Sequence, residues 1–181
     1  MAGNPFDLTG RTAMVTGANT GIGQGIAVAL AKAGANVALV GRSAASETQA
    51  LVEAEGRRAV QISADLSSTA PVGDVVAQAL EALGRIDILV NNAGIIRRED
   101  ALDFSEEDWD VVVDTNMKVL FFLTQAVGRH MVEWSSQSGS RGKIINIASM
   151  LTFQGGIRVP SYTASKSGVG GLTKLLANEW A

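Results

Sequence analysis

The chain has 181 residues, with 15 Lys and Arg against 18 Asp and Glu, and its formal net charge of −3 favours neither nucleic acid nor an anionic membrane as a partner. It has no cysteine, which excludes disulfides and thiolate catalysis, and with a single histidine we expect no metal site. No apolar run approaches the length of a membrane span and no leader opens the chain, so we expect a cytoplasmic globular protein.

Short apolar, β-branched runs alternate with longer stretches of helical period along the chain. The runs typical of buried strands are residues 12–16, 36–40, 59–63, 87–91 and 143–149. Ser105, followed by Asp108, resembles a capping box that opens a long helix, whereas the polar residues 133–142 suit a loop. The alternation predicts an α/β fold: a Rossmann-type, doubly wound parallel sheet in three layers, forming a single domain over residues 1–181.

The first strand-to-helix turn is rich in glycine, with the sequence TGANTGIG over residues 16–23. Glycines there allow a tight turn and let a pyrophosphate approach the backbone at the positive end of the helix. The spacing differs from G-x-G-x-x-G and lacks the Gly-Lys-Ser/Thr ending of an ATP-binding loop. The alternative is a turn whose glycines only permit close packing, but in this strand-to-helix context we favour dinucleotide binding.

Polar residues gather where the later strands are expected to end. Asp65 follows the third strand, the sequence NNAG occupies residues 91–94, and Ser149 ends the fifth strand. Asn116 lies in the long helix. Each has a simple structural explanation, as a helix cap, a turn or a bond to a neighbouring backbone group. Together they favour a site, because ligands of such folds bind beyond the carboxyl ends of the strands.

The sequence SYTASKSG, residues 161–168, holds the only tyrosine of the chain four residues before a lysine. On a helix Tyr162 and Lys166 share one face. A free phenol is a poor base at neutral pH, and an ammonium close to it favours the phenolate. The pair is either an acid/base device or a surface tyrosine beside a solvated lysine. The crevice that it would share with the glycine turn and Ser149 favours the acid/base device.

In combination, TGANTGIG, NNAG, Asn116, Ser149 and YTASK resemble the short-chain dehydrogenase/reductase family, from about Leu8 to the end of the chain. The stretches NNAGIIRRED and ASMLTFQGGIRVPSYTASKSGV resemble more closely the members that act in sugar-acid breakdown. The resemblance implies hydride transfer between a nicotinamide cofactor and a secondary alcohol or ketone of a deoxy or dehydro sugar acid. It also implies a homotetramer.

The resemblance further implies a role for each matching residue. Tyr162 would exchange the proton with the substrate oxygen, and Lys166 would support Tyr162 and hold the nicotinamide ribose. Ser149 would position the reacting oxygen, and Asn116 would hold a water that links Lys166 to solvent. The cofactor-binding residues that it implies are Gly17, Asn19, Thr20, Gly21, Ile22, Gly23, Arg42, Asp65, Leu66, Asn92, Ala93, Gly94, Tyr162 and Lys166. The substrate-binding residues are Ser149, Arg97, Gln154 and Arg158, with Arg98 as a further cation for a carboxylate.

Two features depart from the family pattern. Family members continue beyond the equivalent of Ala181 with further strands and a loop that covers the substrate, so we expect the C-terminal part of the usual fold to be absent from this sequence. At the end of the second strand the sequence is Gly41-Arg42-Ser43, where NAD-specific relatives place an acidic residue. The subfamily resemblance favours NAD. Arg42 argues for NADP, or else is a solvated arginine stacked over the adenine.

Two other features have simple explanations. His130, near the expected end of the long helix, suits the surface better than a metal or a proton-transfer role. The run LFFL, residues 120–123, suits the core or a helix-pairing face in an oligomer. Two alternative functions stay open: a 3-oxoacyl reductase of the same family, whose motifs overlap heavily, and a dinucleotide-binding module without turnover.

Overall fold

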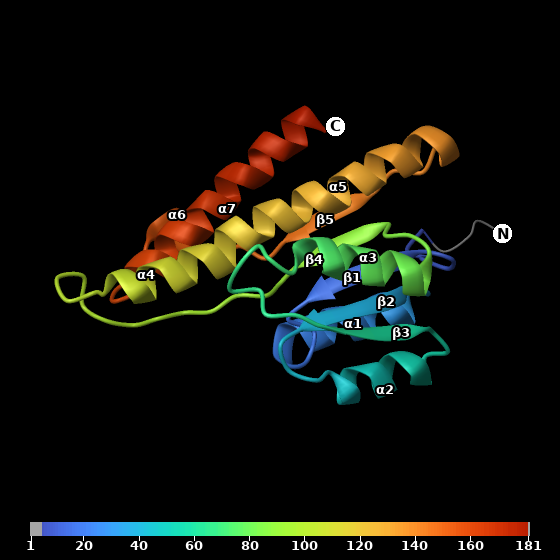
Figure 1. The fold of residues 1–181 in the computed structure, drawn as a ribbon, viewed down its shortest axis with the longest axis horizontal. Coiled ribbons are helices and arrows are strands. Elements are labelled where there is room, and N and C mark those ends of the chain that lie inside the picture. Colours follow the sequence, from blue (N-terminus) through green and yellow to red (C-terminus); the bar gives the residue numbers. More distant parts are fainter. Residues whose placement is uncertain (1–4, 181) are drawn as a thin grey trace.

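The computed structural model describes residues 5–180 and contains a parallel sheet of five strands (Figure 1). The strands are β1 (Thr12–Thr16), β2 (Asn36–Gly41), β3 (Ala59–Ser63), β4 (Ile88–Asn91) and β5 (Lys143–Asn146). Their order across the sheet is β3-β2-β1-β4-β5, and Val15 of β1 is level with Leu39 of β2 and Val90 of β4. From β1 the chain first adds β2 and β3 on one side of the sheet and then β4 and β5 on the other. Where the order of strands reverses in this way, a crevice opens at their carboxyl ends.

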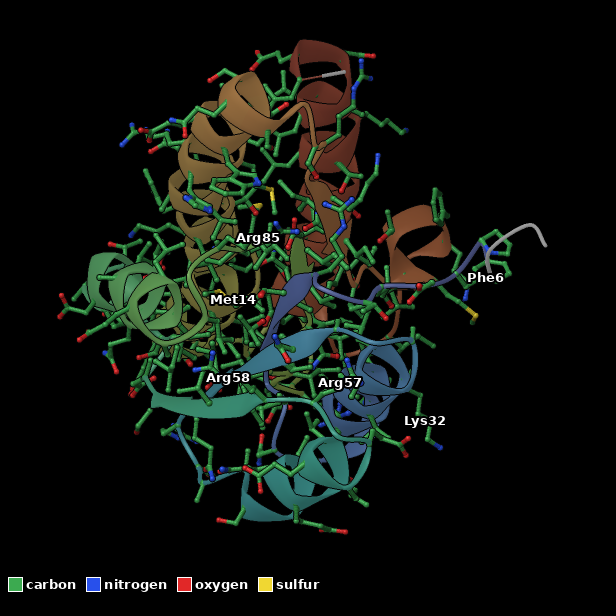
Figure 2. All side chains as sticks on the ribbon, turned by 90° about the vertical axis from the view of Figure 1, so that its right-hand side faces the viewer. Phe6, Met14, Lys32, Arg57, Arg58 and Arg85 are labelled. Carbon is green, nitrogen blue, oxygen red and sulfur yellow. The ribbon has the colours of Figure 1, made fainter. Side chains whose placement is uncertain are left out.

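Helices cover both faces of this sheet. They are α1 (Gly21–Lys32), α2 (Ser46–Ala54), α3 (Val72–Leu83), α4 (Glu106–Val113), the π-helical turn η1 (Asp114–Lys118), α5 (Val119–Ser138), α6 (Leu151–Gln154) and α7 (Pro160–Glu179). In Figure 2 α1 (blue) and α2 (teal) lie on one side of the strands and α3 (green) and α5 (yellow-brown) on the other, and Figure 1 shows α7 beside the long helix of α4, η1 and α5.

Successive side chains of the strands face the two helical layers in turn. Met14, in the middle of β1, is buried in a cluster that includes Val75 of α3 and Leu123 of α5 (Figure 2). Its neighbour Val15 belongs to the opposite cluster, which includes Ala27 of α1. This alternation follows from the period of two along a strand, and the sheet is buried on both faces. The predicted three-layer α/β fold of Rossmann type is confirmed.

The helical stretch from α4 to α5 is continuous and changes its winding once. It opens at Ser105, whose Oγ accepts a hydrogen bond from the Asp108 N–H at 3.1 Å, so the predicted cap is confirmed. The π-helical turn η1 interrupts the α-helical winding, as such turns often do at functional sites. By length and composition alone the stretch could cross a membrane, but half of its apolar window is buried inside the molecule, as in the core helix of a globular protein.

The loop predicted for residues 133–142 is wrong in its first half, because α5 continues to Ser138. Serine hydroxyls satisfy backbone acceptors in its last turns: Ser138 Oγ donates to the Trp134 carbonyl at 2.8 Å. Gly139, with φ of 68°, then takes the left-handed conformation that ends the helix. A contact from outside the helix supports this serine-rich stretch: the Arg85 guanidinium lies over the Trp134 ring, 5.5 Å from its centroid.

This extension also changes the place of His130, which lies within α5 and not near its end. The His130 side chain is half-buried, and its Nε2 accepts a hydrogen bond from the Ile86 N–H at 3.2 Å. In the LFFL run, Leu120 and Leu123 are buried in the core, whereas Phe122 is 40% exposed. The run therefore serves the core on one side and leaves one ring at the surface.

Candidate active site

The glycine turn after β1 has the geometry that a bound phosphate requires. Gly17 and Gly21 have φ of 64° and 57°, in the left-handed region that favours glycine. A Cβ added at Gly23 would collide with the Gly17 carbonyl oxygen, so only glycine lets α1 begin so close to β1. The Asn92 Nδ2 donates to the Thr16 carbonyl at 2.9 Å and to the Gly17 carbonyl at 3.2 Å. The end of β4 is thereby fastened to the turn.

The first turn of α1 has free backbone donors. Its N-cap residue, Thr20, makes no side-chain cap hydrogen bond, and no acidic residue lies in the turn. The first N–H groups of a helix lack intrahelical partners, and the helix dipole places positive potential there. Ile22, 69% exposed, adds apolar surface beside these donors. The residues present therefore fit the pyrophosphate of a dinucleotide.

A cleft of about 320 Å³ opens beside this turn. Its walls come from the ends of β1, β2, β3 and β4 and from the long helix, so it lies where the fold predicts a ligand site. Thr20 and Ile22 stand at the neighbouring helix start, while Gly23 and Asn92 shape the turn. The predicted cofactor residues that line the cleft are Gly17, Asn19, Arg42, Asp65, Leu66, Ala93 and Gly94.

Charge in this cleft is arranged around Asp65 and Arg42. The Asp65 Oδ1 accepts a hydrogen bond from the Ser67 N–H at 3.0 Å, and this bond lowers the pKa of the carboxyl group, with a smaller contribution from the charge of Arg42. Arg42 is exposed and makes no hydrogen bond or ion pair to residues 5–180. Its guanidinium is therefore available to an anion in the cleft.

Tyr162 and Lys166 meet on one face of α7, as their spacing predicts. The Lys166 Nζ lies 5.8 Å from the centroid of the Tyr162 ring. Lys166 is only 3% exposed, its Nζ donates to the Ile147 carbonyl at 2.6 Å, and burial lowers its pKa. Tyr162 is half-buried, and its hydroxyl makes no hydrogen bond within the part of the chain that the structure describes. The phenol is therefore free to bond a ligand beside a buried cation.

Asn116 is fully buried in η1 and joins the long helix to the turn after β4. Its Nδ2 donates to the Ile95 carbonyl at 2.9 Å, and its Oδ1 accepts from the Ile95 N–H at 2.8 Å. A Cβ added at Gly94 would lie 3.1 Å from the Asn116 Oδ1 and 3.7 Å from the Lys166 Nζ. The end of NNAG, the π-helical turn and α7 therefore converge at Gly94.

Ser149 lies between β5 and α6, and it is half-buried. Its Oγ accepts a hydrogen bond from the Leu151 N–H at 3.2 Å, which leaves the hydroxyl hydrogen to donate. The strand predicted for residues 143–149 is three residues too long, because β5 ends at Asn146 and the next carbonyl, of Ile147, binds Lys166. The segment that carries Ser149 thus begins at the contact with Lys166.

The arginines predicted to bind a substrate carboxylate are paired with acidic residues of the chain. The Arg97 Nε lies 3.1 Å from Asp108 Oδ1, and the Arg158 guanidinium lies 3.0 Å from Glu99 Oε1 and 2.9 Å from Asp100 Oδ1. Arg158 has φ of 62°, a strained backbone for a residue other than glycine. The two carboxylates hold this strained residue over the segment that leads to Tyr162.

The remaining predicted contacts are exposed. Arg98 makes no hydrogen bond or ion pair to the described residues, and Gln154 lies at the end of α6. A hydrogen bond from the Asp100 N–H, reinforced by the Arg158 guanidinium, lowers the pKa of Glu99. A substrate carboxylate would therefore compete with Glu99 and Asp100 for Arg158, whereas Arg98 is free of such competition.

A larger cleft of about 680 Å³ lies between the end of α5, β5 and the end of α7. It is lined by residues such as Met131, Lys143 and Trp180, and none of the predicted site residues that the structure describes contributes to it. Size alone would favour this cleft. The chemistry favours the smaller one, where the glycine turn, Gly94 and the Lys166 contact converge.

A doubly wound sheet, a glycine-lined phosphate cradle and a buried lysine beside a free phenol together define a dinucleotide-dependent oxidoreductase of the α/β class. Residues 11–181 match the short chain dehydrogenase family. The chain is also 54% identical over 178 residues to a 2-dehydro-3-deoxy-D-gluconate 5-dehydrogenase of Dickeya dadantii, a match that covers 98% of this chain and 69% of that protein. The chain therefore belongs to the short-chain dehydrogenase family and is an NAD(P)-dependent oxidoreductase of CH–OH groups.

Solved structures agree with this assignment. A candidate short-chain alcohol dehydrogenase from Sinorhizobium meliloti superposes with a TM-score of 0.92 at 46% identity, covering 97% of this chain and 68% of that one. A candidate 2-deoxy-D-gluconate 3-dehydrogenase from Agrobacterium tumefaciens, with bound NADP, gives a TM-score of 0.84 at 53% identity, covering 98% of this chain and 68% of that one. The resemblance drawn from the sequence motifs is confirmed.

Proposed function

We propose that the chain interconverts a secondary alcohol and a ketone on a deoxy or dehydro sugar acid with NAD(P). One observation carries the chemistry: the buried ammonium of Lys166 lies over the ring of Tyr162 and beside Gly94, at the edge of the glycine-lined cleft. The substrate class rests on the relatives named above, whose names specify deoxy or dehydro gluconates.

In this proposal three side chains carry out the proton transfer that accompanies the hydride. When bound, the nicotinamide cofactor supplies or accepts the hydride. The Tyr162 hydroxyl gives a proton to the substrate oxygen or takes one from it, since a proton must move together with the hydride. The ammonium of Lys166, which little water reaches, stabilises negative charge on the phenol oxygen. The Ser149 hydroxyl donates a hydrogen bond to the same substrate oxygen and orients it.

The remaining residues hold the reactants in place. Asn116 keeps the turn after β4 against η1, and in the proposal it also holds a water that connects Lys166 with solvent. Gly17, Thr20, Gly21 and Ile22 receive the pyrophosphate at the start of α1. Lys166 additionally holds the nicotinamide ribose. We further propose that the enzyme works in the cytoplasm as a homotetramer.

Arg42 decides the preference between NAD and NADP in this proposal. Residues 42–46, directly after β2, include no acidic residue, and the unpaired guanidinium of Arg42 suits a 2′-phosphate better than a pair of ribose hydroxyls. We propose that the site accepts both cofactors and that Arg42 favours NADP. Arg42→Ala should weaken NADP binding by roughly tenfold, the size of one charge-assisted contact, and leave NAD binding within twofold. Equal losses for both cofactors would refute the assignment of Arg42.

A substrate panel tests the proposed function. The chain is mixed with NAD or NADP and either 2-deoxy-D-gluconate or a neutral alcohol analogue that lacks the carboxylate, and the appearance of the reduced nicotinamide is followed by its absorbance. In a parallel assay a 3-oxoacyl thioester, which must be reduced, is mixed with NADH or NADPH, and the loss of the same absorbance is followed. We expect turnover of the sugar acid above that of the other two compounds. Turnover of the thioester alone would favour the 3-oxoacyl reductase. Cofactor binding without turnover of any compound would favour a non-catalytic module.

A further inference from the structure

The turn of α7 that carries Tyr162 and Lys166 is held by a hydroxyl on the side of the long helix. The Ser165 Oγ donates to the Tyr162 carbonyl at 2.9 Å and accepts from the Asn116 Nδ2 at 3.3 Å. Ser165 and Asn116 are both fully buried, so water does not compete for these bonds. A carbonyl oxygen has two lone pairs, so the Tyr162 carbonyl can accept from this hydroxyl as well as from the helix.

A second hydroxyl holds the same turn on the side of α6. The Thr152 Oγ1 donates to the Lys166 carbonyl at 2.9 Å and accepts from the Ser149 N–H at 3.3 Å. The methyl group of Thr152 packs against α7, where a Cβ added at Gly170 would lie 2.7 Å from it. Thr152 therefore contacts α7 in two separable ways, through a hydrogen bond and through packing.

We propose that Ser165 and Thr152 are positioning residues: Ser165 aligns the Tyr162–Lys166 turn with Asn116, and Thr152 aligns it with Ser149. Each hydroxyl joins the backbone of the turn to one further residue of the site, so all four groups keep a fixed spacing before the substrate binds. The inference rests on the roles proposed above for those four residues.

Packing offers a competing explanation for both residues. The long helix approaches α7 closely, because a Cβ added at Gly168 would collide with the sulfur of Met117 in η1. A small side chain at position 165 could serve only this approach. Ser165→Ala keeps the small size and removes the hydroxyl. Thr152→Val keeps the branched shape and removes the hydroxyl, whereas Thr152→Ser keeps the hydroxyl and removes the methyl group.

The helix itself provides matched controls. Ser161 and Thr163 flank Tyr162, and the oxygen atoms of both hydroxyls are buried without a hydrogen-bond partner in the described chain. Ser161→Ala is the control for Ser165→Ala, because both remove a buried serine hydroxyl from α7. Thr163→Val is the control for Thr152→Val, because both remove a threonine hydroxyl. Neither control variant breaks a hydrogen bond to the site.

The test measures kcat, KM, cofactor Kd and melting temperature for these variants. We expect Ser165→Ala and Thr152→Val each to lower kcat by roughly tenfold, about the effect of one neutral hydrogen bond, with KM and Kd within about twofold. Thr152→Ser and the two control variants should keep kcat within about twofold of the wild type. If the two hydroxyls fix one common turn, the combined variant should lose less than the product of the single losses.

Two results would overturn the proposal. The first is a kcat for Ser165→Ala and Thr152→Val equal to that of the controls. The second is a loss in Thr152→Ser as large as in Thr152→Val, which would assign the effect to packing. Amide hydrogen exchange in the first two turns of α7 gives a readout without turnover: Ser165→Ala should speed exchange there, and Ser161→Ala should not. A wild-type chain without activity would refute the proposed function, while this exchange measurement would still decide the role of Ser165.

Discussion

The strands of the sheet all begin along one line, here called the amino-end edge, and all end along the opposite line, the carboxyl-end edge. At the amino-end edge the buried carboxylate of Asp87 accepts hydrogen bonds from the Thr12 N–H at 2.8 Å, from Arg11 at 3.1 Å and from Arg85 at 2.7 Å. This edge faces the viewer in Figure 2, where Arg85 is labelled. At the carboxyl-end edge, Lys166 is buried to a similar degree, 3% exposed against 5% for Asp87. Lys166 has no carboxylate partner among residues 5–180 and only the Ile147 carbonyl as acceptor.

The buried charges at the two edges serve different purposes. A charge surrounded by counter-charges and donors, such as Asp87, fixes the ends of neighbouring strands and has little left to offer a ligand. A charge buried without a counter-charge, such as Lys166, stays available to stabilise an anion that forms beside it. Buried ionic groups at the amino-end edge are therefore expected to control stability, and those at the carboxyl-end edge to control chemistry.

The largest effect should come from the phenol at the carboxyl-end edge. Tyr162→Phe removes the proposed proton donor and should lower kcat by about a thousandfold or more, within the range of general acid–base catalysis. Cofactor Kd should stay within about twofold, because the phenol serves the substrate oxygen. Lys166→Ala should damage both kcat and Kd. Turnover by Tyr162→Phe close to that of the wild type would remove the proposed mechanism.

The next effect tests the amino-end edge through stability. Asp87→Ala leaves the Thr12 N–H and Arg85 without this acceptor and leaves Arg11 with only the Ser140 hydroxyl, and we expect the free energy of unfolding in urea to fall by about 2–3 kcal/mol. This lies below the ~3–5 kcal/mol of a fully buried pair, because the side chains of Arg11 and Arg85 are 39% and 26% exposed. The kcat of the folded variant should not change. A loss of kcat without a loss of stability would abolish the contrast between the two edges.

The third prediction concerns Arg158, which is paired with carboxylates although it lies near the proposed site. If Arg158 exchanges Glu99 and Asp100 for a substrate carboxylate, Arg158→Met should raise KM for the sugar acid by roughly tenfold and spare a neutral analogue. Replacing Glu99 and Asp100 by their amides should then lower KM, since the guanidinium loses its competitors. If the amide variant instead raises KM, the carboxylates are needed to hold Arg158, and Arg98 becomes the better candidate for the carboxylate contact.

The sequence predicted the parts of this site that depend on local patterns. The glycine turn, the Tyr162–Lys166 spacing and the ends of the first four strands follow from short-range geometry, and the structure places them within a residue of the prediction, whereas β5 ends three residues earlier than predicted. The sequence did not predict contacts between residues that are far apart in the chain and are brought together only by the fold. Ser165 stands directly before Lys166 in the motif, but its contact with Asn116 spans 49 positions of the chain, and Thr152 has no local signal. The pairing of Arg158 with Glu99 depends on two loops meeting in space.

The smallest expected effect concerns the uncompensated charge of Lys166 in the chain without cofactor. Burial lowers its pKa below the ordinary value of 10.5, so just below pH 10.5 the unfolded chain binds more protons than the folded one, and stability rises with pH there. Lys166→Met removes this charge, so its advantage over the wild type in unfolding free energy should be full at neutral pH and shrink as pH approaches 10.5. Lys174→Met, at an exposed position of α7, corrects for the loss of one positive charge. A difference between Lys166→Met and the wild type that does not change with pH would mean that the pKa of Lys166 is the same in the folded and unfolded chain, and a difference that grows towards pH 10.5 would mean that Lys166 has a counter-charge; either result would remove its contrast with Asp87.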